Sequence, residues 1–252
     1  MTNREFADML IHLATKEKTL YVNGCYGKRL TEPQKQYYIN NYSYNRGLLR
    51  KPKILKASNE TVGGDCICII KAVLDGWNPT TPGDSCGVVY NPKHDLTEKG
   101  LLDACGASVS SDFNNIEVGE FLYLPGHGGV YIGDGLAVEC TPSWKDGVQI
   151  TAVHNIAKRS DYDGRKWDKH GKLPWIDYLR QYMKADVPIL QYGMTGNDVK
   201  RLQTLLNLRG ASLEIDGSFG PATLEAVKNF QKDYLLDVDG SVGGATWSRL
   251  IK

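Results

Sequence analysis

The sequence predicts an α+β fold for most of the chain, followed by a small all-α unit. Three observations lead to this prediction. Apolar side chains recur at helical spacing near the start, short β-rich segments separated by Gly-containing turns follow residue 117, and two similar Asp-Gly turns each precede a helical pattern near the end. A run of helices followed by a run of adjacent strands is typical of the α+β class.

The first predicted helix spans residues 3–16. Thr2 and Glu5 have the spacing of a capping box, in which each side chain binds the backbone N–H of the other residue. Apolar side chains then line one face: Phe6, Met9, Leu10 and Leu13. A second helical pattern runs from Ile69 to Trp77, which puts Cys66 near a helix N-terminus. We expect short helix and loop over residues 30–60 and a closing helix near 175–185.

The predicted strands share a short, β-branched and aromatic composition: Phe121–Leu124, Val130–Ile132, Leu136–Val138 and Val148–Thr151. A three-residue loop at 133–135 pairs Ile132 with Leu136. Alternation then sorts the aliphatic side chains onto one face and the polar ones onto the other. In this register His127 and Glu139 are diagonal neighbours, roughly 7–8 Å apart along the sheet. A two-residue loop would turn one strand over and separate them.

Composition excludes several classes of protein. The chain has 252 residues, 41% of them hydrophobic and 23% charged, which fits a globular protein of two domains. Its formal net charge of +1 gives no electrostatic reason to expect nucleic acid or an anionic membrane as partner. No apolar stretch is long enough for a membrane span, and residues 1–6 do not read as a secretory signal, so we expect synthesis in the cytoplasm and no membrane insertion.

The six cysteines are not expected to form disulfides or a zinc site. The chain is too long to need covalent staples, and no Cys-x-x-Cys pair exists. We therefore predict no metal and no cofactor.

Cys66 is the predicted nucleophile. A helix N-terminus favours an anion, so it would lower the pKa of a thiol there and raise its thiolate fraction. Cys68 is the rival, but two residues rotate a helical side chain by about 200°, so the two thiols cannot face one cleft. Taken alone, a cysteine at an apolar helix start is more often a small buried hydrophobe.

His127 is the predicted base, with Glu139 as the carboxylate that fixes its tautomer. A lone histidine at a strand start is usually only a surface residue, and the carboxylate on the same face is what favours a functional pair. The remaining histidines have no comparable carboxylate on a predicted shared face: His12, His94, His154 and His170.

We predict a first domain over residues 1–182, a linker over 183–188 and a second domain over 189–252. The second domain contains an internal repeat, in which Asp216-Gly217-Ser218 is echoed by Asp239-Gly240-Ser241. Pro221 suits the first turn of a helix that follows the first copy.

The first domain resembles the NlpC-type cysteine peptidases, which are papain-like cell-wall hydrolases. The segments that carry the resemblance are Asp65-Cys66-Ile67-Cys68-Ile69, His127-Gly128-Gly129-Val130-Tyr131-Ile132-Gly133 and Thr19-Leu20-Tyr21-Val22-Asn23-Gly24-Cys25. The resemblance implies a papain-like fold of helices on an antiparallel sheet, with Cys66, His127 and Glu139 as catalytic residues and Tyr21 shaping the substrate cleft. Cys68 stands where the family has glycine, and Glu139 where histidine is commoner.

The second domain resembles the small peptidoglycan-binding domain of three helices, on the segments 196–206, 216–223 and 226–231. Together the two resemblances imply a monomeric peptidoglycan hydrolase of the phage endolysin type, reaching the wall after holin-type release. D-Glutamyl–diamino acid endopeptidase activity is favoured; N-acetylmuramoyl-L-alanine amidase activity and a non-catalytic wall-binding protein are the alternatives.

Overall fold

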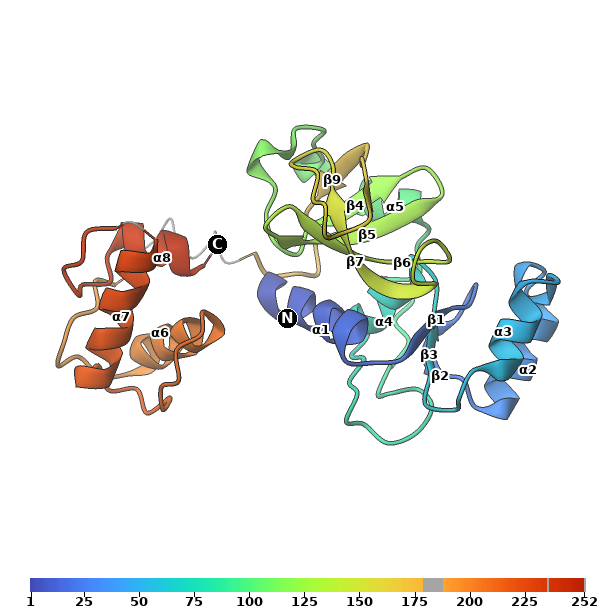
Figure 1. Ribbon diagram of the computed structural model, residues 1–252, viewed down its shortest axis with the longest axis horizontal. Coiled ribbons are helices and arrows are strands. Elements are labelled where there is room, and N and C mark those ends of the chain that lie inside the picture. Colours follow the sequence, from blue (N-terminus) through green and yellow to red (C-terminus); the bar gives the residue numbers. More distant parts are fainter. Residues whose placement is uncertain (179–187, 235, 252) are drawn as a thin grey trace. The chain divides into compact units, whose positions relative to one another are not determined.

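A computed structural model describes residues 1–178, 188–234 and 236–251. The chain divides into two units, Met1–Tyr178 and Leu179–Lys252, which are considered separately (Figure 1). The predicted linker at 183–188 and closing helix near 175–185 lie mostly outside the described residues. No helix within the described ranges is long and apolar enough to cross a membrane.

The first unit mixes helices and strands, as the sequence predicts. Its helices are α1 (Asn3–Thr15), α2 (Glu32–Asn41), α3 (Arg50–Lys56), α4 (Cys68–Leu74) and α5 (Glu98–Ala104), with short 3-10 turns at Tyr44–Arg46, Gly106–Ser108 and Phe113–Asn115. Its strands are β1 (Thr19–Tyr21), β2 (Tyr26–Arg29), β3 (Val62–Gly64), β4 (Phe121–Leu124), β5 (His127–Gly133), β6 (Leu136–Thr141), β7 (Gly147–Val153), β8 (Gly164–Arg165) and β9 (Lys169–Gly171).

Helix α1 begins with the predicted capping box. The Glu5 N–H donates to Thr2 Oγ1 at 3.2 Å, and the Thr2 N–H donates to Glu5 Oε2 at 2.8 Å. The apolar face of the helix is buried at Phe6, Leu10 and Leu13. These side chains join a core formed with α4 and the large sheet, so α1 and α4 cover one face of that sheet.

The large sheet has six strands in the order β8-β7-β6-β5-β4-β9. Its β4–β7 segment is an antiparallel meander, in agreement with the four predicted strands. Side chains at alternating positions enter two different cores. Phe121, Val130 and Val138 face α1 and α4, whereas Leu122, Tyr131 and Ala137 belong to a second cluster with Trp167. The predicted common face of Val130, Ile132 and Val138 is confirmed. The opposite face, predicted to be polar, is largely a second apolar cluster.

The β5–β6 hairpin has the predicted register with a different turn. Gly129 pairs with Glu139, and Tyr131 pairs with Ala137. The predicted Ile132–Leu136 pair is wrong, because an irregularity between Tyr131 and Gly133 pairs Gly133 with Leu136 instead. Asp134, with φ 52°, and Gly135, with φ 72°, form a two-residue turn. The extra residue on β5 offsets the shorter loop, so the strand is not turned over.

A separate small sheet, in the order β1-β3-β2, leads into the turn that carries Cys66. Strands β1 and β3 run parallel and pair Tyr21 with Gly64, two residues before Cys66. Glycine is needed at position 64, because a Cβ there would lie 2.2 Å from the Ile69 side chain. Tyr21 and the cysteine turn are thereby held side by side.

The second unit contains α6 (Asn197–Leu208), α7 (Pro221–Asp233) and α8 (Gly244–Leu250), with Pro221 in the first turn of α7 as predicted. The three helices surround their own apolar core, which includes Leu202, Phe219 and Trp247.

The internal repeat of this unit forms the same hydrogen-bond network twice. In the first copy the Gln203 amide donates to Asp216 Oδ1 at 2.7 Å and accepts from the Gly217 N–H at 2.8 Å. In the second, Gln231 donates to Asp239 Oδ1 at 2.8 Å and accepts from the Gly240 N–H at 2.9 Å. Both glutamines are buried, so each closes its turn against the helical core.

Candidate functional site

Cys66 lies in the turn that joins β3 to α4. The helix begins two residues later, at Cys68, so Cys66 precedes the helix. Asp65 organises this turn. Its Oδ1 accepts from the Ile67 and Cys68 N–H groups at 3.0 and 2.7 Å, and its Oδ2 accepts from the Gly24 N–H at 2.7 Å. The Asp65 carboxylate thus occupies the N–H groups that were expected to favour a Cys66 thiolate.

The expected lowering of the Cys66 pKa is therefore wrong. Burial raises the pKa of the Cys66 thiol to about 12, the Asp65 carboxylate adds to the rise, and a backbone hydrogen bond at Gly128 opposes it. At neutral pH the thiol is protonated, so it needs a base to become a nucleophile. The Gly128 contact also puts the start of β5, where His127 is the preceding residue, against Cys66.

The two neighbouring thiols share some of their surroundings, because both lie near Asp65 and Cys140. Since Cys66 precedes the helix, their predicted divergence by helix rotation stays a prediction. The Cys66 thiol contacts the Gly128 backbone, and its charge raises the pKa of the Tyr21 hydroxyl. The charge of the Cys68 thiol instead raises the pKa values of the Tyr26 and Tyr42 hydroxyls. Burial and Asp65 raise the pKa of Cys68 well above its ordinary value as well.

His127 and Glu139 form the predicted pair. His127 Nε2 lies 2.7 Å from Glu139 Oε2, while the side chains are 14% and 0% exposed respectively. No hydrogen bond to His127 Nδ1 is recorded within the described residues.

The Glu139 carboxylate is held by two further side chains. Thr151 Oγ1 donates to Oε1 at 2.7 Å and Arg165 Nε donates to Oε1 at 3.2 Å, while Arg165 Nη2 forms an ion pair with Oε2 at 2.8 Å. A fully buried carboxylate requires this compensation. Trp167 stacks on His127, with ring centroids 5.6 Å apart and planes 17° from parallel.

Arg165, Trp167 and Thr151 also belong to the site, although none of them was among the predicted site residues. Strand alternation could have found Thr151, because it lies on a predicted strand two residues from Gln149, which pairs with Glu139. Arg165 and Trp167 come from a polar stretch without a periodic pattern, and only the folded chain brings them to Glu139.

Tyr21 lies beside the cysteine turn as expected. Burial raises the pKa of its hydroxyl, and the Cys66 and Asp65 groups raise it further, so the hydroxyl remains a donor at neutral pH. Its ring meets Tyr44 edge-on at 5.8 Å. Arg50 lies over the Tyr21 ring, donates to its carbonyl oxygen, and pairs with Asp146 at 2.7 Å. This buried arginine fixes the wall of the site next to Cys66.

Three of the four remaining histidines have carboxylate partners that no predicted shared face indicated. His94 Nδ1 lies 2.5 Å from Asp75 Oδ1, and His12 Nε2 lies 3.3 Å from Glu17. His170 Nδ1 binds Glu120. Tertiary structure brings distant partners together. Asp75 and His94, for example, are 19 residues apart in the sequence.

His170 is saturated by structural contacts. Its Nε2 lies 2.9 Å from the Asp112 carbonyl oxygen, so both ring nitrogens are occupied. Burial opposes its charged form, yet the contacts with Glu120 and Asp112 outweigh burial and raise the pKa of His170. A histidine with both nitrogens bound cannot relay a proton to a substrate.

All six cysteines are free, and the described residues contain no group of three or more His, Cys, Asp and Glu side chains that could hold a metal.

Comparisons with known proteins give a family match in the C-terminal unit. Residues 195–250 match the family described as "Putative peptidoglycan binding domain". The chain is 42% identical over 65 residues to a spore cortex-lytic enzyme of Halalkalibacterium halodurans, covering 25% of this chain and 20% of the relative. It is 44% identical over 64 residues to a zinc D-Ala-D-Ala carboxypeptidase of Streptomyces albus G, covering 24% of this chain and 25% of the relative.

Among solved structures, a Burkholderia AP3 phage endolysin is 44% identical with a TM-score of 0.25, over 25% of this chain and 24% of that one. The chain thus spans only a fifth to a quarter of the length of the two curated relatives. The names of these proteins describe different enzymes, one of them a zinc enzyme, so the shared segment does not specify a catalytic chemistry. The α+β first unit is therefore followed by a segment that matches a peptidoglycan-binding domain and is similar to part of a spore cortex-lytic enzyme and of a D-Ala-D-Ala carboxypeptidase.

Proposed function

We propose that the chain is a peptidoglycan hydrolase that cuts an amide bond of the stem peptide with Cys66 as its nucleophile. His127 is the general base and acid, Glu139 orients His127, and Tyr21 shapes the cleft. The observation that carries the proposal is the His127–Glu139 hydrogen bond. His127 begins strand β5, and the next residue of that strand, Gly128, contacts the Cys66 thiol. The peptidoglycan-binding domain supports the choice of substrate.

The raised pKa of Cys66 determines how the first step runs. Because the thiol is protonated, it passes its proton to His127 Nδ1 as Sγ attacks the carbonyl carbon. The Cys66 backbone N–H is the nearest candidate donor to the oxyanion. His127 then protonates the leaving amine, and the C–N bond breaks to leave a thioester on Cys66.

Water completes the reaction. His127 takes a proton from the water molecule as its oxygen attacks the thioester carbon, and the Cys66 thiol leaves with that proton. Glu139 keeps Nε2 protonated throughout, so that Nδ1 is the nitrogen that exchanges protons.

The favoured bond joins D-glutamate to the diamino acid of the stem, and the alternative joins muramic acid to L-alanine. Digested wall labelled at its new amino termini distinguishes the two by mass spectrometry. New diamino-acid amines indicate the endopeptidase, and new L-alanine amines indicate the amidase.

The nucleophile is tested with matched variants. Cys66→Ala should abolish clearing of a wall suspension, whereas Cys68→Ala should keep it, because the two thiols face different residues. Lysis by Cys66→Ala together with its loss in Cys68→Ala would refute the assignment. Wall binding without lysis in the unmodified chain would identify a non-catalytic wall-binding protein instead.

The proposed context is that of a phage or prophage endolysin released by a holin-type pore. Expression in a bacterial host with and without a holin tests it: lysis should require the holin. Lysis in its absence would reject this route.

A further inference from the structure

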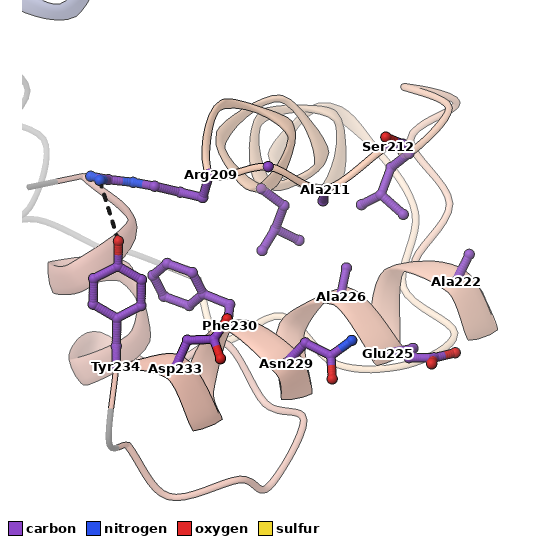
Figure 2. A pocket seen from close by; sticks show the side chains of 13 residues that line it. Arg209, Ala211, Ser212, Ala222, Glu225, Ala226, Asn229, Phe230, Asp233 and Tyr234 are labelled. Carbon is purple, nitrogen blue, oxygen red and sulfur yellow. Dashed lines mark hydrogen bonds between the residues drawn. The ribbon is translucent and has the colours of Figure 1, made fainter.

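A groove in the second unit runs between the 209–213 segment and helix α7, with a volume of about 370 Å³. Figure 2 shows polar side chains along it from both sides. Arg209 and Tyr234 lie at one end, Asn229 is near the middle, and Ser212 and Glu225 lie toward the other end. Ala226 and Phe230 supply an apolar floor between them. The groove lies within the segment that matches the peptidoglycan-binding domain.

The polar side chains of α7 at this groove serve no internal contact. Glu225, Asn229 and Asp233 are spaced by four residues, so they form one stripe along the helix. All three are exposed, and no side-chain hydrogen bond or ion pair of theirs is recorded among the described residues. By contrast, Gln231 on the buried side of α7 closes a turn network. The stripe is therefore available to a ligand without loss of a structural contact.

Arg209 adds a positive charge that no carboxylate of the described residues neutralises. Its Nη1 donates to Tyr234 Oη at 3.5 Å and its Nη2 to the Leu250 carbonyl at 3.4 Å, both long contacts. Its Cζ lies 5.9 Å from the Tyr234 ring centroid, and its Nε is buried without a partner. These contacts hold the guanidinium in place. Within the described part of the chain it forms no ion pair, so it can still bind an anion.

The dimensions and charges of the groove suit a short peptide. Glu225 and Asp233 are eight residues apart on a helix, which is about 12 Å, the length of three to four extended residues. Arg209 and Asp233 both line the groove and carry opposite charges, which complement the carboxylate and the ammonium of an amino-acid end. Asn229 can pair with a peptide amide in between. Neutral sugar hydroxyls would leave these charges without partners.

We propose that this groove binds an uncross-linked stem peptide through the free end of its diaminodicarboxylic acid. The carboxylate of that end binds Arg209, its ammonium binds Asp233, and the rest of the peptide extends past Asn229 toward Glu225. This inference rests on the proposed function for its target, the wall, but not on the cysteine mechanism. It implies that the domain favours wall with unlinked stems, where amide bonds still await cutting.

The test uses the full chain with Cys66→Ala, so that the wall is not digested during the measurement. Binding to insoluble peptidoglycan is measured by pelleting, with and without competing soluble ligands. The competitors are a stem tripeptide ending in a diaminodicarboxylic acid, the same tripeptide with its amine acetylated, and a wall disaccharide without peptide.

Asp233→Asn and Arg209→Gln should each weaken wall binding about tenfold, because each removes one charge-assisted contact. Two control changes outside the groove, Asp237→Asn and Glu214→Gln, should leave wall binding unchanged. The tripeptide should compete, and acetylation of its amine should reduce competition about tenfold. Equal binding by the Asp233 and Asp237 variants, or competition by the disaccharide but not the peptide, would overturn the proposal.

Failure of this proposal is distinguishable from failure of the proposed function. Asp233→Asn and Arg209→Gln, made in a chain that keeps Cys66, should leave cleavage of soluble stem peptides unchanged, because the proposed catalytic residues lie in the other unit. Loss of wall binding with normal cleavage supports the groove. Lysis by Cys66→Ala would refute the cysteine mechanism while leaving the pelleting results valid.

Discussion

The Glu139 carboxylate binds His127 Nε2 through Oε2 at 2.7 Å, and the same oxygen forms an ion pair with Arg165 Nη2 at 2.8 Å. The histidine is therefore oriented by a carboxylate whose own charge is balanced by a guanidinium. The orientation of His127 depends on both residues, although only one of them touches it.

Replacing the carboxylate tests this arrangement directly. Glu139→Gln keeps the shape of the side chain but allows His127 to adopt the wrong tautomer, so kcat on a soluble stem peptide should fall about 100-fold or more. Glu120→Gln is the matched control, since Glu120 is also a buried carboxylate paired with a histidine. It should leave kcat unchanged. Equal losses in the two variants would show a general effect on stability.

Arg165 is expected to act as a positioning residue through Glu139. Arg165→Lys keeps the charge but replaces a two-point contact with one, so kcat should fall by about tenfold with little change in KM. Arg165→Met should lose more. The exposed Arg159–Asp161 pair supplies a control in Arg159→Lys, which should have normal kcat. A rise in KM alone would instead assign Arg165 to substrate binding.

The raised pKa of Cys66 predicts slow alkylation at neutral pH. In a His127→Ala chain, the rate of iodoacetamide labelling at Cys66, mapped by mass spectrometry, should rise about tenfold per pH unit from pH 7 to 10. Because burial and Asp65 raise the pKa, less thiolate exists at each pH than in a free cysteine. A rate plateau below pH 8 would show that the helix terminus lowers the pKa after all.

Asp65→Asn in the His127→Ala chain separates the two causes of the raised Cys66 pKa, which are burial and the charge of Asp65. The amide can still accept the N–H groups of the turn but carries no charge, so labelling at pH 8 should become several-fold faster. An unchanged rate would assign the whole rise to burial.

The repeated glutamine networks predict two equivalent local effects in the second unit. Gln203→Ala should destabilise the turn by about 1–3 kcal/mol, because the Gly217 N–H and the Asp216 carboxylate lose a buried partner. Amide hydrogen exchange of Gly217 should become faster. Gln231→Ala should do the same at Gly240.

Gln191→Ala is the control for both changes, because the Gln191 side chain makes an exposed contact with Ser241. Its effect should be below about 0.5 kcal/mol. Unaltered exchange at Gly217 in Gln203→Ala would mean that the network does not stabilise the turn.

The sequence alone determined the features that local periodicity encodes. Alternation along residues 127–139 was enough to put His127 and Glu139 on one face, since a change of one residue in register moves every side chain of a strand to the opposite face. The Thr2 and Glu5 caps and the two Asp-Gly-Ser repeats could be predicted for the same reason, because their partners lie within a few residues or recur in a repeated pattern.

Tertiary structure decided the features that depend on distant partners and on burial. The pKa of Cys66 is raised because folding buries the thiol and lets Asp65 take the N–H groups of the turn, which a helix-terminus argument could not foresee. Arg165 and Trp167 reach His127 and Glu139 only through the folding of a segment without periodicity. Pairing between residues far apart in sequence depends on the whole chain path, and no local pattern records it.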